Sequence, residues 1–293
     1  MLQPPILRPG QVLRDLMKQG TVTMPGVFNP LSAIAAQKAG AGAIYLSGGA
    51  MTNAHLGVPD IALITQDEMA GVAARTCQVI SIPILSDADT GFGETWNVAR
   101  TVIEMERAGL AGIHIEDQVN PKRCGHLDGK ELISSGDMEK KIRVAVDHKR
   151  DDSFLIFART DARSVEGLDG AILRAQKYVE AGADGIFPEG LQSEAEFEKF
   201  RAAISVPLLA NMTEFGKTPL IPVNRFSELG YEIVIFPVTA LRVAVKAMQD
   251  WYQHVLTTGT QADYLDKMCT RQELYELIEY PTYTRRDQEW SDR

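Results

Sequence analysis

Short runs of hydrophobic residues recur along this 293-residue chain, and polar segments with helical spacing separate them. Eight runs rich in β-branched residues predict strands, at residues 22–28, 43–47, 82–87, 112–116, 154–159, 185–188, 206–211 and 233–237. The segments between them predict helices, for example at 95–108, 137–148, 168–181 and 193–203. A glycine suited to ending a helix stands before four of the strands, at Gly40, Gly109, Gly182 and Gly230.

The alternation of apolar strands with helices predicts an α/β fold whose parallel sheet is covered on both faces. Eight strand–helix units in about 240 residues match a (β/α)8 barrel of the TIM type in number and in length. An open, doubly wound sheet is the competing architecture. Gly40 and Gly42 do not form a dinucleotide-binding loop, because they precede their strand and lack a third glycine.

No low-complexity tract or Pro/Ser-rich linker divides the chain, so residues 1–293 are expected to form a single barrel domain. Helical sequence continues past the eighth strand, at about 240–256 and again at 261–278, which is more than a barrel requires. We therefore expect residues from about 240 to 293 to form a C-terminal helical extension that packs against a partner subunit.

Composition narrows the class of protein. The chain is 45% hydrophobic and 24% charged, and its net charge of -9 argues against nucleic-acid binding without excluding a small anionic substrate. Cys77, Cys124 and Cys269 form no C-x-x-C pair, which argues against a disulfide framework or structural zinc. The N-terminus lacks the apolar core of a signal peptide, and no run approaches the roughly 18 apolar residues of a membrane span. We expect a cytoplasmic enzyme or binding protein that has no membrane partner.

Polar residues close the predicted strands, where a barrel builds its active site. The candidates are Tyr45, Ser47, Gly48, Gly49, Asp87, Asp89, Glu116, Arg159, Glu189, Asn211 and Thr213. Asp87 and Asp89 alternate along one strand, so their carboxylates can converge. With Glu116 they suit an oxygen site for Mg²⁺, or Mn²⁺ as the second choice. The plainer interpretation is a strand-end turn capped by aspartates.

The loop after the fourth strand, residues 122–126, reads Lys-Arg-Cys-Gly-His. Positive charge beside a thiol makes it a better thiolate or proton carrier, and glycine lets the backbone approach a ligand. His126 suits a general acid–base or a neighbour that tunes Cys124, and a structural histidine fits almost as well. For the whole loop, the alternative is a basic surface turn. His114, inside the fourth strand, is interpreted as a buried histidine with satisfied hydrogen bonds.

Three arginines are candidates for binding substrate carboxylates, because a guanidinium grips a carboxylate at two points. Arg159 closes an apolar strand, where a functional role is the better interpretation. Arg242 and Arg271 lie in helical sequence, where a solvated face is the default.

Several ordered motifs resemble the isocitrate lyase/phosphoenolpyruvate mutase superfamily. They begin at Tyr45 (YLSGG), Asp87 (DADTGFG), Ile115 (IEDQ), Lys122 (KRCGH), Ala158 (ARTDA), Leu209 (LANMTEFG) and Thr270 (TRQELY). The resemblance runs from about residue 12 to residue 283. It is greatest to the branch that cleaves 2-methylisocitrate in the methylcitrate cycle of propionate catabolism, which Phe187 also matches. Phosphoenolpyruvate mutases lack the KRCGH loop, and isocitrate lyases carry KKCGH with long insertions for which this chain has no room.

The resemblance implies a Mg²⁺-dependent lyase that breaks a carbon–carbon bond and releases pyruvate and succinate. It also implies a homotetramer in which the last helices swap between subunits. Cys124 would donate a proton to the carbanion, with Lys122, Arg123 and His126 tuning its pKa. Tyr45 is the candidate base, and Glu116 or a metal-bound water are alternatives.

The same resemblance divides the substrate contacts between two ends. Those expected at the pyruvate end are Ser47, Gly48, Gly49 and Arg159. Those expected at the succinate end are Gly125, Asn211, Thr213, Arg242 and Arg271, while Glu189 has a positioning role.

Three sister activities on this scaffold remain alternatives: 2,3-dimethylmalate lyase, oxaloacetate acetylhydrolase and oxaloacetate decarboxylase. The first two carry similar Cys-Gly-His loops. Arg271 favours a tricarboxylate, because a third carboxylate needs a third cationic partner. A non-catalytic dicarboxylate-binding protein is a remote alternative, since Cys124 and both aspartates are present.

Overall fold

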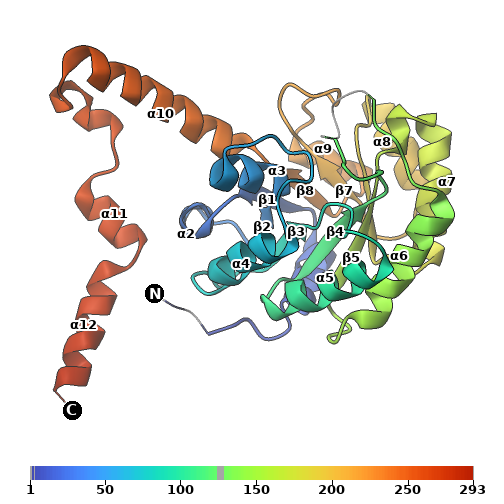
Figure 1. Cartoon of the computed structure of the whole chain (residues 1–293), viewed down its shortest axis with the longest axis horizontal. Helices are drawn as coiled ribbons and strands as arrows, with labels where there is room; N and C mark the ends of the chain where they lie inside the picture. The colour runs from blue at the N-terminus through green and yellow to red at the C-terminus, as the bar shows by residue number, and fades with distance from the viewer. Residues whose placement is uncertain (1, 3, 124–128, 293) are drawn as a thin grey trace.

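Eight parallel strands form a barrel in the computed structural model, which describes residues 2, 4–123 and 129–292 (Figure 1). They are β1 (Val22–Val27), β2 (Ile44–Leu46), β3 (Ile84–Asp87), β4 (Gly112–Glu116), β5 (Leu155–Thr160), β6 (Gly185–Pro188), β7 (Leu209–Asn211) and β8 (Ile233–Phe236). Neighbours pair in the order β6-β5-β4-β3-β2-β1-β8-β7, and a parallel bridge from Ile186 to Leu208 links β6 to the start of β7. The TIM-type barrel is confirmed, and each predicted strand overlaps an observed one.

Side chains alternate along the strands and build two apolar layers. Phe157 and Ile235 belong to the cluster inside the barrel, whereas their neighbours Ile156 and Val234 belong to the cluster under the helices. This two-sided burial explains why the strands read as continuous apolar runs.

Helix α1 (Pro9–Gln19) closes the barrel at the end where the strands begin. Its Leu13 and Met17 side chains join the interior cluster. Gly10 permits this approach, because a Cβ there would lie 2.2 Å from the carbonyl oxygen of Ser153.

The outer helices are α2 (Pro30–Lys38), α4 (Gln66–Cys77), α5 (Thr95–Arg107), α6 (Ser135–His148), α7 (Gly167–Glu180), α8 (Glu194–Ala203) and α9 (Val223–Leu229). Thr65 and Glu68 form a capping box at the start of α4, and the Ser134 and Ser193 hydroxyls cap α6 and α8. The predictions for α5 to α8 are confirmed within two residues at each end. No helix in the described part of the chain is both long and apolar enough to cross a membrane.

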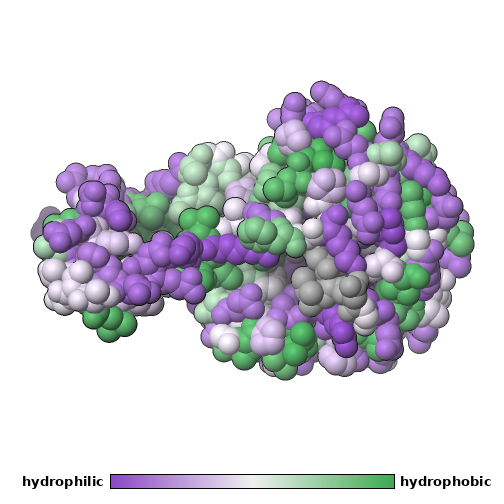
Figure 2. Space-filling model, turned by 90° about the horizontal axis from the view of Figure 1, so that it is seen from above, coloured by the Kyte–Doolittle hydropathy of each residue, from purple (hydrophilic) through white to green (hydrophobic). Residues whose placement is uncertain are grey.

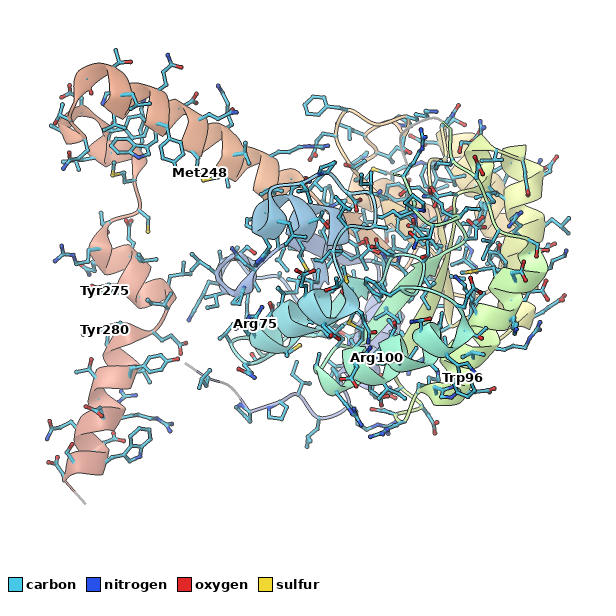
Figure 3. All side chains as sticks on the ribbon, in the orientation of Figure 1. Arg75, Trp96, Arg100, Met248, Tyr275 and Tyr280 are labelled. Carbon is cyan, nitrogen blue, oxygen red and sulfur yellow. The ribbon has the colours of Figure 1, made fainter. Side chains whose placement is uncertain are left out.

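The C-terminal tail leaves the barrel through α10 (Thr239–Thr258) and continues as η3 (Ala262–Lys267), α11 (Arg271–Leu277) and α12 (Tyr280–Ser291), as Figure 1 shows. The sequence predicted one helical stretch over 261–278, but the structure divides it into two helices. Met268 is extended, and Thr270 caps a new helix. Many apolar side chains of the tail are exposed, including Tyr275 and Tyr280, which are labelled in Figure 3. Figure 2 shows hydrophobic patches on this projecting part.

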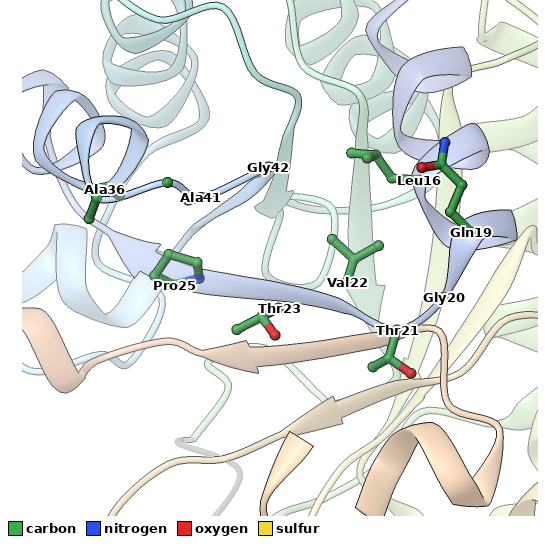
Figure 4. Close-up of a pocket in the computed structure, with 12 residues that line it drawn as sticks. Leu16, Gln19, Gly20, Thr21, Val22, Thr23, Pro25, Ala36, Ala41 and Gly42 are labelled. Atoms are coloured by element: carbon green, nitrogen blue, oxygen red, sulfur yellow. The ribbon is translucent and has the colours of Figure 1, made fainter. Parts of the chain in front are cut away.

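A cavity of about 560 Å³ lies beside the first half of β1 (Figure 4). Leu16, Thr23, Ala36 and Ala41 are among its lining residues, and none of the lining side chains is titratable. It lies toward the ends where the strands begin, away from the candidate residues. It is therefore not the candidate active site.

Candidate active site

The carboxyl ends of the strands enclose a cavity of about 70 Å³. The ends of six strands and the segment before α4 supply its lining: Tyr45, Ser47, Gly49, Asp60, Asp87, Arg159, Phe187, Glu189, Asn211, Thr213, Ile235, Pro237 and Val238. Parallel strands deliver their carboxyl ends to one face, which is why residues far apart in sequence meet here. The structure thus brings most of the strand-end candidates together.

The end of β2 turns directly into the short helix α3 (Gly48–Met51). The Ser47 hydroxyl caps it by accepting a 3.2 Å hydrogen bond from the Ala50 N–H. A Cβ on Gly48 would lie 2.6 Å from Asp87 Oδ2, and a Cβ on Gly49 would lie 3.0 Å from Asp60 Oδ2. The two glycines therefore let the backbone pack against two carboxylates.

Three buried carboxylates lie at the ends of β3 and β4: Asp87 and Glu116 are the last residues of these strands, and Asp89 follows β3. Asp87 Oδ1 accepts a 2.9 Å hydrogen bond from the Asp89 N–H, and Asp89 has a left-handed φ of 44°, so a tight turn keeps both residues inside. Burial raises the pKa of Asp89 to about 6 and the pKa of Glu116 well above its ordinary value. Asp89 Oδ2 and Glu116 Oε1 are buried without a hydrogen-bond partner.

These oxygens fit a hard divalent cation. Buried carboxylate oxygens without donors are costly unless positive charge offsets them, and Mg²⁺ prefers oxygen ligands. Among the described residues, no group of three or more His, Cys, Asp or Glu side chains has the spacing of a complete protein ligand set, so water would have to complete the coordination. Mg²⁺ keeps several waters and commonly needs only one or two protein carboxylates, so the arrangement remains suited to it.

Lys122 is buried within this acidic group, with 3% of its surface exposed. Its Nζ lies 2.6 Å from Asp60 Oδ1 and 2.9 Å from Asp89 Oδ1. Burial alone disfavours the charged amine, but surrounding carboxylates, Asp89 foremost, hold the pKa of Lys122 well above its ordinary value. Lys122 is therefore a buried cation. The sequence predicted a role beside Cys124, and the structure in addition places its ammonium among the carboxylates of the site.

The rest of the KRCGH loop is described only at its start. The Arg123 N–H donates a 2.9 Å hydrogen bond to Gln118 Oε1, and the Arg123 carbonyl accepts one of 2.8 Å from Gln118 Nε2. Cys124, Gly125 and His126, for which roles were predicted, lie outside the described residues.

Arg159 reaches the cavity from β5 within a network of charges. Its Nε donates to Asp161 Oδ2 at 3.0 Å and lies 3.2 Å from Glu116 Oε2, while its Nη2 lies 3.5 Å from Glu189 Oε2. Lys130 Nζ donates to the other oxygen of Asp161 at 2.8 Å. A guanidinium held in this way needs little further ordering when it binds a carboxylate.

The opposite wall carries amide and hydroxyl groups. Asn211 Nδ2 donates a 3.0 Å hydrogen bond to Glu189 Oε2, whereas Asn211 Oδ1 is buried without a partner. At the mouth, Arg242 Nη1 donates to Glu214 Oε2 at 2.6 Å and lies 3.4 Å from Thr213 Oγ1. Arg242 therefore stands beside the cavity, paired with a carboxylate of its own chain.

Arg271 is not brought to the cavity within one chain. It begins α11 on the projecting tail and is exposed (Figure 1). The chain itself thus does not supply the expected third carboxylate partner, because the tail leads away from the barrel after β8.

Tyr45 and His114 form a buried pair inside the barrel, with the Tyr45 hydroxyl 2.7 Å from His114 Nε2. Burial raises the pKa of Tyr45 well above its ordinary value and lowers the pKa of His114 to about 4. Near neutral pH both are uncharged, which argues against Tyr45 as the base. The interpretation of His114 as fully satisfied is wrong, because its Nδ1 has no hydrogen-bond partner.

Two residues of the site were not identified from the sequence. His114 stands two positions before Glu116 on β4, and this period of two could have placed both on the inward face. Asp60 lies in the segment before α4, where no strand end marks it. No sequence signal would have found Asp60.

Comparison with known proteins gives a consistent result. Residues 13–256 match the family model described as phosphoenolpyruvate phosphomutase. The chain is 54% identical over 292 residues to a 2-methylisocitrate lyase of Aeropyrum pernix, which covers 99% of this chain and 94% of that protein.

Solved structures agree in fold. A crystal structure of 2,3-dimethylmalate lyase, described as a PEP mutase/isocitrate lyase superfamily member, is 34% identical with a TM-score of 0.92, covering 98% of this chain and 96% of that one. A phosphonopyruvate hydrolase complex with oxalate and Mg²⁺ is 28% identical with a TM-score of 0.86, covering 95% and 97%. The chain therefore belongs to the phosphoenolpyruvate phosphomutase family, within the PEP mutase/isocitrate lyase superfamily.

Proposed function

We propose that this protein is a carbon–carbon lyase that cleaves 2-methylisocitrate to pyruvate and succinate with the help of a divalent cation. The observation that supports this type of reaction is the group of buried carboxylates that faces Arg159 at the ends of the strands. Identity of 54% along nearly the whole chain supports the substrate, against 34% for the dimethylmalate enzyme.

The metal would be Mg²⁺, with Mn²⁺ as a substitute. Asp87, Asp89 and Glu116 would hold it, directly or through water, and it would supply positive charge to the hydroxyl and carboxylate of the substrate. The unpartnered oxygens of Asp89 and Glu116 support this assignment, as does the Mg²⁺ in the phosphonopyruvate hydrolase complex.

The cavity walls suit the two ends of the substrate. Ser47, Gly48, Gly49 and Arg159 bind the carboxylate of the pyruvate end, next to the acidic group. Asn211, Thr213 and Arg242 bind the succinate end, and Glu189 positions Asn211. Such donors stabilise the charge that moves onto oxygen as the bond breaks.

The reaction moves two protons and one electron pair. The substrate hydroxyl gives its proton to a base, the carbonyl of pyruvate forms, and the carbon–carbon bond breaks. The electron pair left on the succinate end takes a proton from the Cys124 thiol, whose pKa the neighbouring Arg123 and His126 tune. Of the two side-chain candidates for the base, Glu116 fits better than Tyr45, because burial raises the pKa of Tyr45 and keeps its phenol protonated.

The protein acts as a homotetramer in which the C-terminal helices swap between subunits. The exposed apolar side chains of the tail support this, since Val243, Leu256 and Trp290 are each more than half exposed in the single chain. The swap carries Arg271 to the active site of a partner subunit. Sparse cysteines and a metabolic substrate favour the cytoplasm.

The first test is a Mg²⁺-dependent assay of the purified protein. Pyruvate release from 2-methylisocitrate is followed beside reactions with isocitrate, 2,3-dimethylmalate and oxaloacetate. We expect a strong preference for 2-methylisocitrate that EDTA abolishes, with weaker turnover of isocitrate because one methyl group is worth only about 1–3 kcal/mol. Preference for dimethylmalate or oxaloacetate would move the protein to a sister activity.

A further inference from the structure

The Lys122 ammonium joins two carboxylates from separate parts of the chain. Asp60 lies before α4 and Asp89 follows β3, yet Lys122 Nζ contacts Oδ1 of both, at 2.6 and 2.9 Å. Lys122 and Asp89 are almost fully buried, and the Asp60 side chain is 22% exposed. The lysine is therefore shared between the two acids.

Asp89 is also one of the carboxylates assigned to the metal. Its Oδ1 contacts the Lys122 ammonium, whereas its Oδ2 is buried without a hydrogen-bond partner. One oxygen of Asp89 is therefore paired with a cation, and the other can still accept a ligand. A divalent cation at Asp89 lies close to the Lys122 charge. Repulsion between like charges is strong where water is excluded.

The geometry points to Lys122 as the residue that limits the affinity of this site for its divalent cation. The ammonium and the metal share Asp89 as counter-ion, and Asp60 is the second partner that holds the lysine when the metal takes Asp89. This inference rests on the proposed metal dependence. It gives Lys122 a positioning role toward the metal site and makes Asp60 act through Lys122, not as a ligand.

Mn²⁺ binding to the metal-stripped full-length protein, followed by electron paramagnetic resonance of free Mn²⁺, measures this without turnover. We expect Lys122→Met to bind Mn²⁺ about tenfold more tightly than wild type, and Asp60→Asn about tenfold more weakly. The double variant should bind Mn²⁺ as tightly as Lys122→Met does, because without Lys122 the Asp60 carboxylate no longer has the ammonium that it contacts. Lys122→Arg keeps the charge and should stay within about threefold of wild type.

The matched control is Lys130→Met. Lys130 is a buried lysine of the same site, but its 2.8 Å partner is Asp161, which is not assigned to the metal. It should change Mn²⁺ affinity clearly less than Lys122→Met does. Unfolding temperatures of all variants identify any that fail to fold, and Lys122→Gln replaces Lys122→Met in that case.

The outcomes separate two failures. If Lys122→Met and Lys122→Gln bind Mn²⁺ as wild type does, or more weakly, the inference is overturned while the metal assignment stands. A double variant that binds as weakly as Asp60→Asn overturns the role given to Asp60. If wild type binds no Mn²⁺, the metal dependence itself is wrong.

Discussion

The Tyr45 hydroxyl lies 2.7 Å from His114 Nε2, and both side chains are buried inside the barrel. His114 Nδ1 has no partner, and a buried N–H without an acceptor is rarer than a bare acceptor. We therefore assign the His114 proton to Nε2, where it is donated to the Tyr45 oxygen. The Tyr45 O–H is then free to donate into the cavity.

Tyr45→Phe removes this donor and should lower kcat/KM about 100-fold. Because the pKa of Tyr45 lies well above its ordinary value, its phenol does not ionise between pH 7 and about 10. The alkaline limb of the kcat/KM profile should therefore be the same in wild type and variant. Loss of that limb in Tyr45→Phe would instead identify Tyr45 as the titrating group.

Gly48→Ala should damage the acidic group without touching a charged residue. Its Cβ would lie 2.6 Å from Asp87 Oδ2, so Asp87 must move, and a shift of this kind can lower kcat/KM about 100-fold. Gly42→Ala is the matched control, because a Cβ there meets nothing within 4 Å. Steady-state kinetics and Mn²⁺ titration of both variants measure the loss of kcat/KM and of metal affinity. Equal behaviour of the two would show that the backbone approach at Gly48 is unimportant.

Cys124→Ser should lower kcat about 10³-fold or more, because a serine hydroxyl is a far weaker acid than a thiol. Mn²⁺ affinity should be unchanged, since no metal role is assigned to Cys124. A variant that retains kcat within about tenfold of wild type would rule out Cys124 as the proton donor.

Arg271 tests the swapped tail by complementation. Arg271→Ala and Cys124→Ser should each be inactive alone. When the two are co-expressed, random pairing should restore about a quarter of the sites, because the tail of a Cys124→Ser subunit completes an Arg271→Ala barrel. Cys124→Ser with Asp87→Ala is the control and should stay inactive, since both changes lie in the barrel. No restoration with Arg271→Ala would argue against a tail shared between subunits.

Cys77 should resist alkylation. It lies at the end of α4, and burial raises its pKa to about 12, so only about one molecule in 10⁴ carries the thiolate at pH 8. Cys269 is exposed on the tail and provides the internal comparison. Iodoacetamide treatment followed by peptide mass spectrometry should label Cys269 well before Cys77. Equal labelling would mean that α4 opens readily at its end.

The sequence predicted the barrel and the strand-end site because both depend on local patterns. Continuous apolar runs mark strands buried on two sides, and a polar residue that ends such a run must face the carboxyl end of the barrel. Asp87, Arg159 and Asn211 were found by this pattern alone. Their meeting at one cavity follows from the parallel topology.

Contacts between distant segments were not predictable in the same way. Lys122 adjoins Cys124 in sequence, but its direction is set by Asp60 and Asp89 from two other segments. The helical character of the tail was visible, but its path was not, since amphipathic spacing does not say which surface a helix covers. Arg271 therefore could be placed on a helix but not near the site.

The position of helix α1 determines from which side substrate enters and products leave the barrel. Leu13 and Met17 pack into one end of the barrel, and Phe157 and Ile235 are among the side chains that fill its interior. In the part of the chain that the structure describes, the active-site cavity is therefore reached from the carboxyl ends of the strands. Substrate must enter and both products must leave on the side where Arg242 stands. In the proposed binding mode the succinate end lies toward Arg242, so we expect succinate to leave before pyruvate.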